Sequence, residues 1–226
     1  MTRESDSVLN SLFNTEGSLD TLTASERRLL KFAVDNFGEP LSRILLAGLW
    51  EDGVEQRWQF NITFTDTGAA TYECRLQVIT YELIEGESYL PRRRDPLVLL
   101  ALLHFLLGET GEPKTELTFE PRDVLTGLGW RNTDEARREV DEVMERYSAL
   151  TYMWILSGGE STQKGWVKGR ERLFSNYRTI DEEGQNGGRQ EFRHIVFNTA
   201  FIDALRRRTL FGVDWGRVTS IKAIRG

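Results

Sequence analysis

The residues best suited to chemistry in this chain are closely spaced cations in its second half. The stretch QKGWVKGRERLFSNYR carries five of them, with Trp166 and Tyr177 between: Lys164, Lys168, Arg170, Arg172 and Arg178. Cations along a glycine-broken ribbon match the phosphates of a nucleic-acid backbone, which they bind tightly but without sequence choice. The alternative interpretation is a polar hairpin exposed to solvent.

A second group of candidates surrounds the start of a charged helix, TDEARREVDEVMERYSAL. Its apolar residues recur at a spacing of three and four and predict one buried side, made of Ala136, Val140, Val143, Met144 and Tyr147. A helix in the DNA major groove presents its N-terminal residues to base edges, where Asn and Arg recognise adenine and guanine. The candidates for base contacts are therefore Arg131, Asn132, Thr133, Arg137 and Arg138.

The same helix also has an acidic side. From Thr133 onward it carries six acidic residues against three arginines, so its C-terminal half repels phosphate. Exposed charge pairs such as Asp134–Arg138 and Glu142–Arg146 explain its composition equally well. We expect only the first turn or two to approach DNA closely.

A cluster of three arginines, Arg92, Arg93 and Arg94, precedes the N-terminus of an apolar helix. The helix dipole disfavours cations there, so the cluster points weakly to a function. We expect it either to contact phosphate or to pair with acidic residues of the N-terminal region.

The chain contains residue types that enzymes use for catalysis, but they do not occur at the spacings of catalytic or metal-binding motifs. His104 falls in an apolar helix and His194 in an alternating strand, and neither has a second His or Cys at metal-ligand spacing. Nucleophile-elbow, Walker and dinucleotide-binding motifs do not occur. Cys74, the single cysteine, fits a reducing compartment. We predict a cytoplasmic protein that is not an enzyme and holds no metal or cofactor, with a metal-dependent nuclease built from scattered carboxylates left open.

Charge is unevenly distributed along the 226 residues. The net charge of −6 argues mildly against nucleic-acid binding. Residues 1–110 hold 10 Lys and Arg against 17 Asp and Glu, whereas residues 147–226 hold 13 against 8. This asymmetry fits a nucleic-acid face on an acidic protein, and it fits chance about as well. The longest apolar run, residues 97–107, is shorter than the roughly 20 residues of a membrane span, so we expect no membrane segment.

The elements expected to position the candidates form an α+β fold. A helix over 23–37, capped by Thr23 or Ser25 and ended by Gly38 before Pro40, precedes a β-hairpin of strands 57–64 and 71–83. From residue 95 the expected order is helix, short strand, helix, turn, helix, two or three antiparallel strands, and a closing helix. That order is a winged helix-turn-helix.

We accordingly predict four segments. Residues 1–22 form a flexible arm, and residues 23–88 form a helix and hairpin region that is a candidate surface for a partner or a homodimer. Residues 89–208 form a winged-helix DNA-binding domain. Residues 209–226 form a linker or the start of a truncated second winged helix.

Several motifs of residues 88–220 resemble the plasmid and bacterial replication initiators of the replication initiator A type. They are LPRRRDPLVLLALLHFLL, LTFEPRDVLTGLGW, the charged helix ending in YSALTYMWI, and FNTAFIDALRRR followed by GVDWGRVTSI. The resemblance implies binding to repeated sites in double-stranded origin DNA and recruitment of host replication proteins. The chain departs from the family in its acidic third helix and in ending at Gly226, where a second winged helix would begin.

Three functions remain open at this point. The first is a replication-initiator-like DNA-binding protein, and the second is a winged-helix transcriptional regulator. The third is a winged-helix protein-interaction module, whose acidic third helix faces a basic partner.

Overall fold

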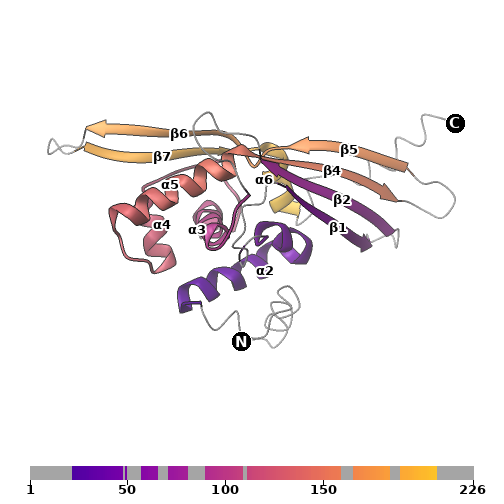
Figure 1. The fold of residues 1–226 in the computed structure, drawn as a ribbon, viewed down its shortest axis with the longest axis horizontal. Helices are drawn as coiled ribbons and strands as arrows, with labels where there is room; N and C mark the ends of the chain where they lie inside the picture. Colours follow the sequence, from indigo (N-terminus) through magenta and orange to yellow (C-terminus); the bar gives the residue numbers. More distant parts are fainter. Residues whose placement is uncertain are drawn as a thin grey trace.

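The computed structural model describes residues 22–47, 49, 57–65, 71–80, 90–108, 111–158, 165–183 and 189–207. Helices and antiparallel strands mix along the chain, which confirms the α+β class (Figure 1). The elements are α2 (Ala24–Leu45), β1 (Arg57–Thr65), β2 (Thr71–Thr80), α3 (Asp95–Leu107), β3 (Glu116–Phe119), α4 (Pro121–Leu128), α5 (Asp134–Ala149), β4 (Leu150–Gly158), β5 (Gly165–Glu171), β6 (Phe174–Glu183), β7 (Arg189–Phe197) and α6 (Thr199–Arg207).

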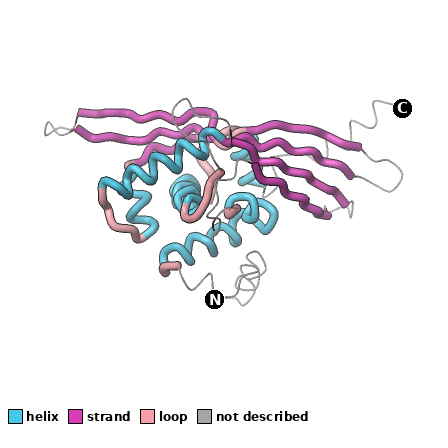
Figure 2. The backbone as a smooth tube through the Cα atoms, viewed as in Figure 1, coloured by secondary structure: helices cyan, strands magenta, loops and turns pink. Residues whose placement is uncertain are grey.

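The strands form two sheets that extend in opposite directions from the helices (Figure 2). One sheet has four strands in the order β1-β2-β4-β5, and the other has three in the order β3-β7-β6. The predicted hairpin is confirmed, because β1 and β2 pair from Arg57 opposite Ile79 to Thr65 opposite Thr71. Since β2 also pairs with β4, the hairpin shares a sheet with residues of the predicted winged-helix segment.

Helix α3 is the centre of the hydrophobic core. Its apolar residues are buried nearly all round, and it packs against α2, α4 and α5. Each leucine buried this way stabilises the fold by about 1.5–3 kcal/mol relative to exposure. His104 lies at the boundary of this core, exposed, with its ring centroid 4.9 Å from that of Phe32. No described helix combines the length and hydropathy needed to cross a membrane.

Helix α2 begins as predicted but ends later. The Glu26 amide donates to the Thr23 hydroxyl at 3.2 Å, and the Thr23 amide donates to the Glu26 carboxylate at 2.7 Å, so Thr23 caps the helix. The predicted end at Gly38 is wrong, because the helix continues through Pro40 to Leu45. Proline within a helix costs about 3 kcal/mol. Burial of Leu45, with Leu46 and Leu49 just beyond, offsets that cost.

A tight turn joins α4 to α5. Gly129 ends α4 in the left-handed conformation at φ 71°, which glycine adopts without strain. Thr133 then caps α5 by accepting a hydrogen bond from the Ala136 amide at 3.2 Å. The predicted buried side of α5 is confirmed, since Val140, Val143, Met144 and Tyr147 are buried and Ala136 packs against the core.

We predicted one strand over 165–176, as part of a single wing ribbon over 164–178. That prediction is wrong. The chain forms two strands there, and they belong to different sheets: β5 pairs with β4, whereas β6 pairs with β7. Leu173 and Phe174 are buried between them, which anchors the change of sheet in the core. Alternation in sequence gives the faces of a strand but not its partner, so the sequence could not reveal this division.

The order α3, β3, α4, α5, β6, β7, with the three-stranded sheet β3-β7-β6, is compatible with a winged-helix fold. The strands β4 and β5 stand between α5 and β6 and belong to the other sheet. The predicted arm, the predicted segment over 209–226 and Lys164 lie outside the described residues.

Candidate nucleic-acid interface

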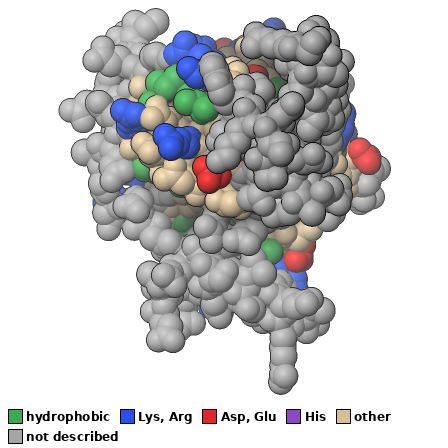
Figure 3. All heavy atoms as spheres, turned by 90° about the vertical axis from the view of Figure 1, so that its right-hand side faces the viewer, with side chains coloured by type: hydrophobic (Ala, Val, Ile, Leu, Met, Phe, Trp, Pro, Cys, Tyr) green, Lys and Arg blue, Asp and Glu red, His purple; other side chains and the backbone are tan. Residues whose placement is uncertain are grey.

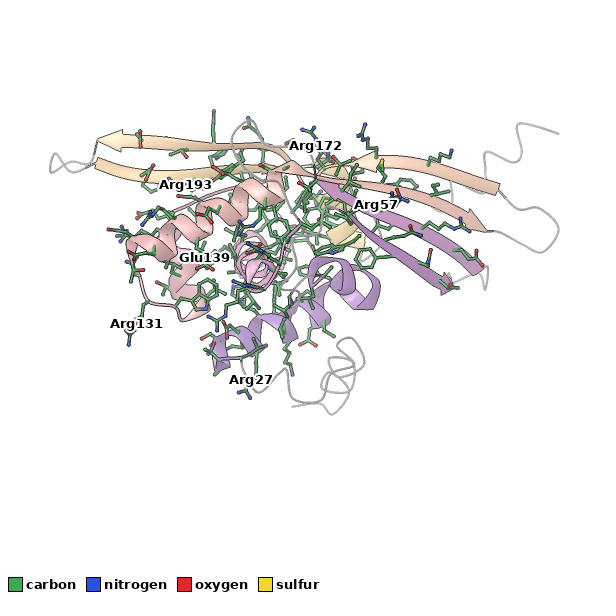
Figure 4. The ribbon with its side chains drawn as sticks, viewed as in Figure 1. Arg27, Arg57, Arg131, Glu139, Arg172 and Arg193 are labelled. Atoms are coloured by element: carbon green, nitrogen blue, oxygen red, sulfur yellow. The ribbon has the colours of Figure 1, made fainter. Side chains whose placement is uncertain are left out.

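The turn before α5 and the first turns of that helix bring together the five candidates for base contacts. Arg131, Asn132 and Thr133 are exposed in the turn, and Arg137 and Arg138 are exposed on α5. In Figure 4 the Arg131 side chain extends away from the body of the protein. The Arg137 Nε donates to the Asn132 side-chain oxygen at 2.7 Å, which fixes the amide at the entrance to the helix.

A groove of about 670 Å³ runs between α4, α5 and β7. Four arginines and four acidic residues line it, so its formal charge is balanced. Two of these arginines are held by neighbouring carboxylates. The Arg122 Nε lies 2.8 Å from a Glu120 oxygen, and Arg193 binds Asp141 through two nitrogens at 2.6 and 2.7 Å.

The pair between Arg193 and Asp141 joins β7 to α5. Hydrogen bonds to the Asp141 carboxylate raise the pKa of Arg193 above its ordinary value. The neighbouring Tyr177 hydroxyl lies 3.5 Å from the same carboxylate, and burial raises the pKa of that tyrosine. This cluster fixes the angle between the helix and the hairpin of β6 and β7.

The outward side of α5 is acidic along most of its length. Glu135, Glu139, Glu142 and Glu145 are exposed on it. Glu142 lies 3.8 Å from Arg146 as predicted, whereas Asp134 pairs at 3.8 Å with Arg137 instead of the predicted Arg138. The charge of α5 therefore leaves its N-terminal end as the part suited to approach a polyanion.

The three arginines before α3 lie in two different surroundings. Arg94 occupies the N-cap position of α3, 3.6 Å from Glu26, and its guanidinium carbon lies 5.5 Å from the centroid of the Trp130 ring. Arg93 is exposed with φ 53°, a conformation unusual for a residue with a side chain. Arg92 and Arg93 line a groove of about 410 Å³ against the outward side of α5.

A buried carboxylate that the sequence analysis did not single out fixes the α4–α5 turn. Glu26 is fully buried and accepts a hydrogen bond from the Trp130 indole nitrogen at 3.0 Å. Burial opposes its ionisation, but hydrogen bonds from Thr23 and Trp130, together with Arg94, hold the pKa of Glu26 below its ordinary value. The sequence did carry a signal, because Thr23 and Glu26 have the spacing of a capping box.

The four described cations of the predicted ribbon lie apart. Lys168 and Arg170 are exposed on β5, and Arg172 is exposed just after it, beside the four-stranded sheet. Arg178 is exposed on β6, in the three-stranded sheet.

No family model matches the chain, and no curated protein matches its sequence. Among solved structures, the fold is similar to domains 2 and 3 of RctB. That match has a TM-score of 0.50 at 15% sequence identity and covers 73% of this chain and 58% of the other. A second structure of the same two domains matches with a TM-score of 0.48, also at 15% identity, over 72% of this chain and 57% of the other. The chain thus spans less than two thirds of each matched chain, and the likeness is one of fold.

Proposed function

We propose that this chain is a replication-initiator-like protein that binds double-stranded DNA through a winged helix formed by α3, β3, α4, α5, β6 and β7. The observation that carries the proposal is the exposed start of α5, where Arg131, Asn132, Arg137 and Arg138 gather on a rigid turn. Asn and Arg are the side chains that read adenine and guanine in the major groove. The motifs of residues 88–220 support the initiator class, and the likeness to domains 2 and 3 of RctB supports the fold.

The rigidity of the turn supports base reading rather than a general attraction to phosphate. Glu26 holds Trp130 from one side, and Thr133 caps the helix on the other. Contacts to base edges need side chains held in a fixed register on the duplex. Origin repeats and host replication proteins are the partners that the initiator class implies.

A second candidate function rests on the acidic side of α5. Its four exposed glutamates would suit a basic protein partner, and they disfavour close contact of the whole helix with DNA. On that account the winged helix is a protein-interaction module.

Selection of binding sites from a random duplex pool separates the two functions. We expect the intact chain to enrich a defined sequence, and Asn132→Ala to relax the choice at one position by about 1–3 kcal/mol. Arg28→Gln changes an exposed cation of α2 and serves as the control. Absence of enrichment, with tight binding to a basic peptide, would support the protein-interaction module instead.

A further inference from the structure

The four-stranded sheet has one buried face and one outward face. Leu76 and Val78 of β2, and Tyr152 and Trp154 of β4, are buried on the side of the helices. Residues directly opposite each other in antiparallel strands share a face. The register places Arg75 opposite Ile155, and Ile155 opposite Lys168. Ile155, 41% exposed, shows that this second face is open.

The outward face gathers positive charge in a chain whose net charge is −6. Register and exposure assign to it Arg57 of β1, Arg75 of β2, and Lys168 and Arg170 of β5. Among its described side chains, Glu73 is the acidic one. Figure 3, which looks onto this end of the molecule, shows Lys and Arg around hydrophobic side chains, and in Figure 4 Arg172 points away from the helices.

Protection of sheet edges does not account for this pattern. Charged residues on edge strands prevent pairing with other chains, and β1 and β5 are the edges of this sheet. Arg75, however, lies on β2, which is paired on both sides. A cation at the middle of an open sheet face needs another explanation.

The outward face ends at a cavity of about 520 Å³, at the junction with the three-stranded sheet. Arg170 and Arg172 line it together with one carboxylate, Glu171, and with Thr151, Phe174, Ser175 and Asn198. The Thr151 hydroxyl is buried and has no hydrogen-bond partner among the described residues. Guanidinium and hydroxyl groups around one cavity are the donors that phosphate oxygens accept from.

We infer that the outward face of the four-stranded sheet, defined by Arg57, Arg75, Lys168, Arg170 and Arg172, is a second DNA-binding surface that contacts the phosphate backbone of a duplex. The inference rests on the proposed function and adds to it a surface on the other side of the molecule from the N-terminal end of α5 (Figure 1). A duplex is the ligand that the proposed function supplies. The exposed amides of this face, Gln59 and Asn61, are further donors for phosphate oxygens.

The test is the salt dependence of binding to a 30-base-pair duplex of random sequence, measured by fluorescence anisotropy with the whole chain. The sheet variant is Arg75→Gln with Lys168→Gln. The matched control is Arg28→Gln with Lys114→Gln, which removes the same charge from two exposed positions elsewhere. We expect the sheet variant to lower the slope of log affinity against log salt by about 1.8, and its affinity about tenfold at 150 mM salt. The control variant should change neither the salt slope nor the affinity by more than a small fraction of these amounts.

A charge-conserving variant, Arg75→Lys with Lys168→Arg, should keep the slope and affinity, and equal thermal midpoints show that all variants fold. A sheet variant that behaves like its control would overturn the inference, and so would a loss confined to a single-stranded 30-mer. If Asn132→Ala still alters the selected sequence while the sheet variant has no effect, the inference fails and the proposed function stands. A wild-type chain that binds no duplex at 50 mM salt would defeat both.

Discussion

Two regions of the molecule that contain several arginines use their charge differently. Around α4, α5 and β7 several arginines are held by carboxylates: Arg122 by Glu120, Arg146 by Asp95, and Arg193 by Asp141. On the outward face of the four-stranded sheet, cations outnumber the described acidic residues. The first arrangement stabilises packing, and the second creates a local positive potential.

If the chain binds DNA as proposed, the two regions have separate tasks. A rigid turn with few available cations suits the choice of sequence, because base contacts depend on geometry. A broad cationic face suits affinity, because release of counterions from DNA depends on charge. An acidic protein can therefore bind DNA if its cations are concentrated on one face.

The largest effect should come from breaking an ion pair of the helical region. Asp141→Ala leaves Arg193, 5% exposed, without its bidentate partner and should lower the free energy of unfolding by about 3 kcal/mol. The exposed pair of Asp134 and Arg137 provides the control, and Asp134→Ala should cost about 0.5 kcal/mol or less. Urea denaturation measures both. Equal losses would show that burial does not distinguish the pairs of this region.

A smaller loss should follow from a change in the sheet. A β-carbon at Gly169 would overlap the Trp154 indole, which lies across the strand pair from it. We expect Gly169→Ala to lower stability by about 2 kcal/mol and to weaken duplex binding, since β5 carries two of the cations, Lys168 and Arg170. Gly127→Ala is the milder comparison, because a β-carbon there would lie 3.2 Å from the end of the Phe105 ring, and it should lower the thermal midpoint less than Gly169→Ala does. Wild-type stability of Gly169→Ala would mean that Trp154 is free to move.

The smallest effect concerns Glu26, and it depends on pH. Because the folded state lowers the pKa of this carboxyl, ionised Glu26 stabilises the fold above the ordinary glutamate value near 4.5. That contribution disappears as pH falls through the lowered pKa. Glu26→Gln should therefore cost about 1 kcal/mol at pH 7, and the difference from wild type should shrink below pH 4.5. If thermal melts show the same stability difference between Glu26→Gln and wild type across that pH range, ionised Glu26 is not the stabilising form.

The sequence predicted elements whose signals are local. Thr23 marked the start of α2, alternation marked the β1–β2 hairpin, and spacing marked the buried side of α5. It predicted the end of α2 wrongly, because Gly38 and Pro40 are local stop signals that tertiary burial of Leu45 overrides.

The candidate site depended more on long-range pairing, which a sequence does not display. The cations of 164–178 were identified correctly as exposed where described, but their division between two sheets follows from the pairing of β5 with β4 and of β6 with β7. Arg57 and Arg75 were missed because they reach the same face from strands far away in the chain. Asp141 and Arg193 are 52 positions apart in the sequence, too far for local spacing rules to predict their ion pair.

The most direct test of the central claim is the affinity of the intact chain for a random 30-base-pair duplex at 50 and 200 mM salt. Binding by the turn at α5 together with the sheet face engages on the order of six phosphates, so the affinity should fall about a thousandfold between the two concentrations. An affinity that does not change with salt, or no binding at 50 mM, would contradict the account.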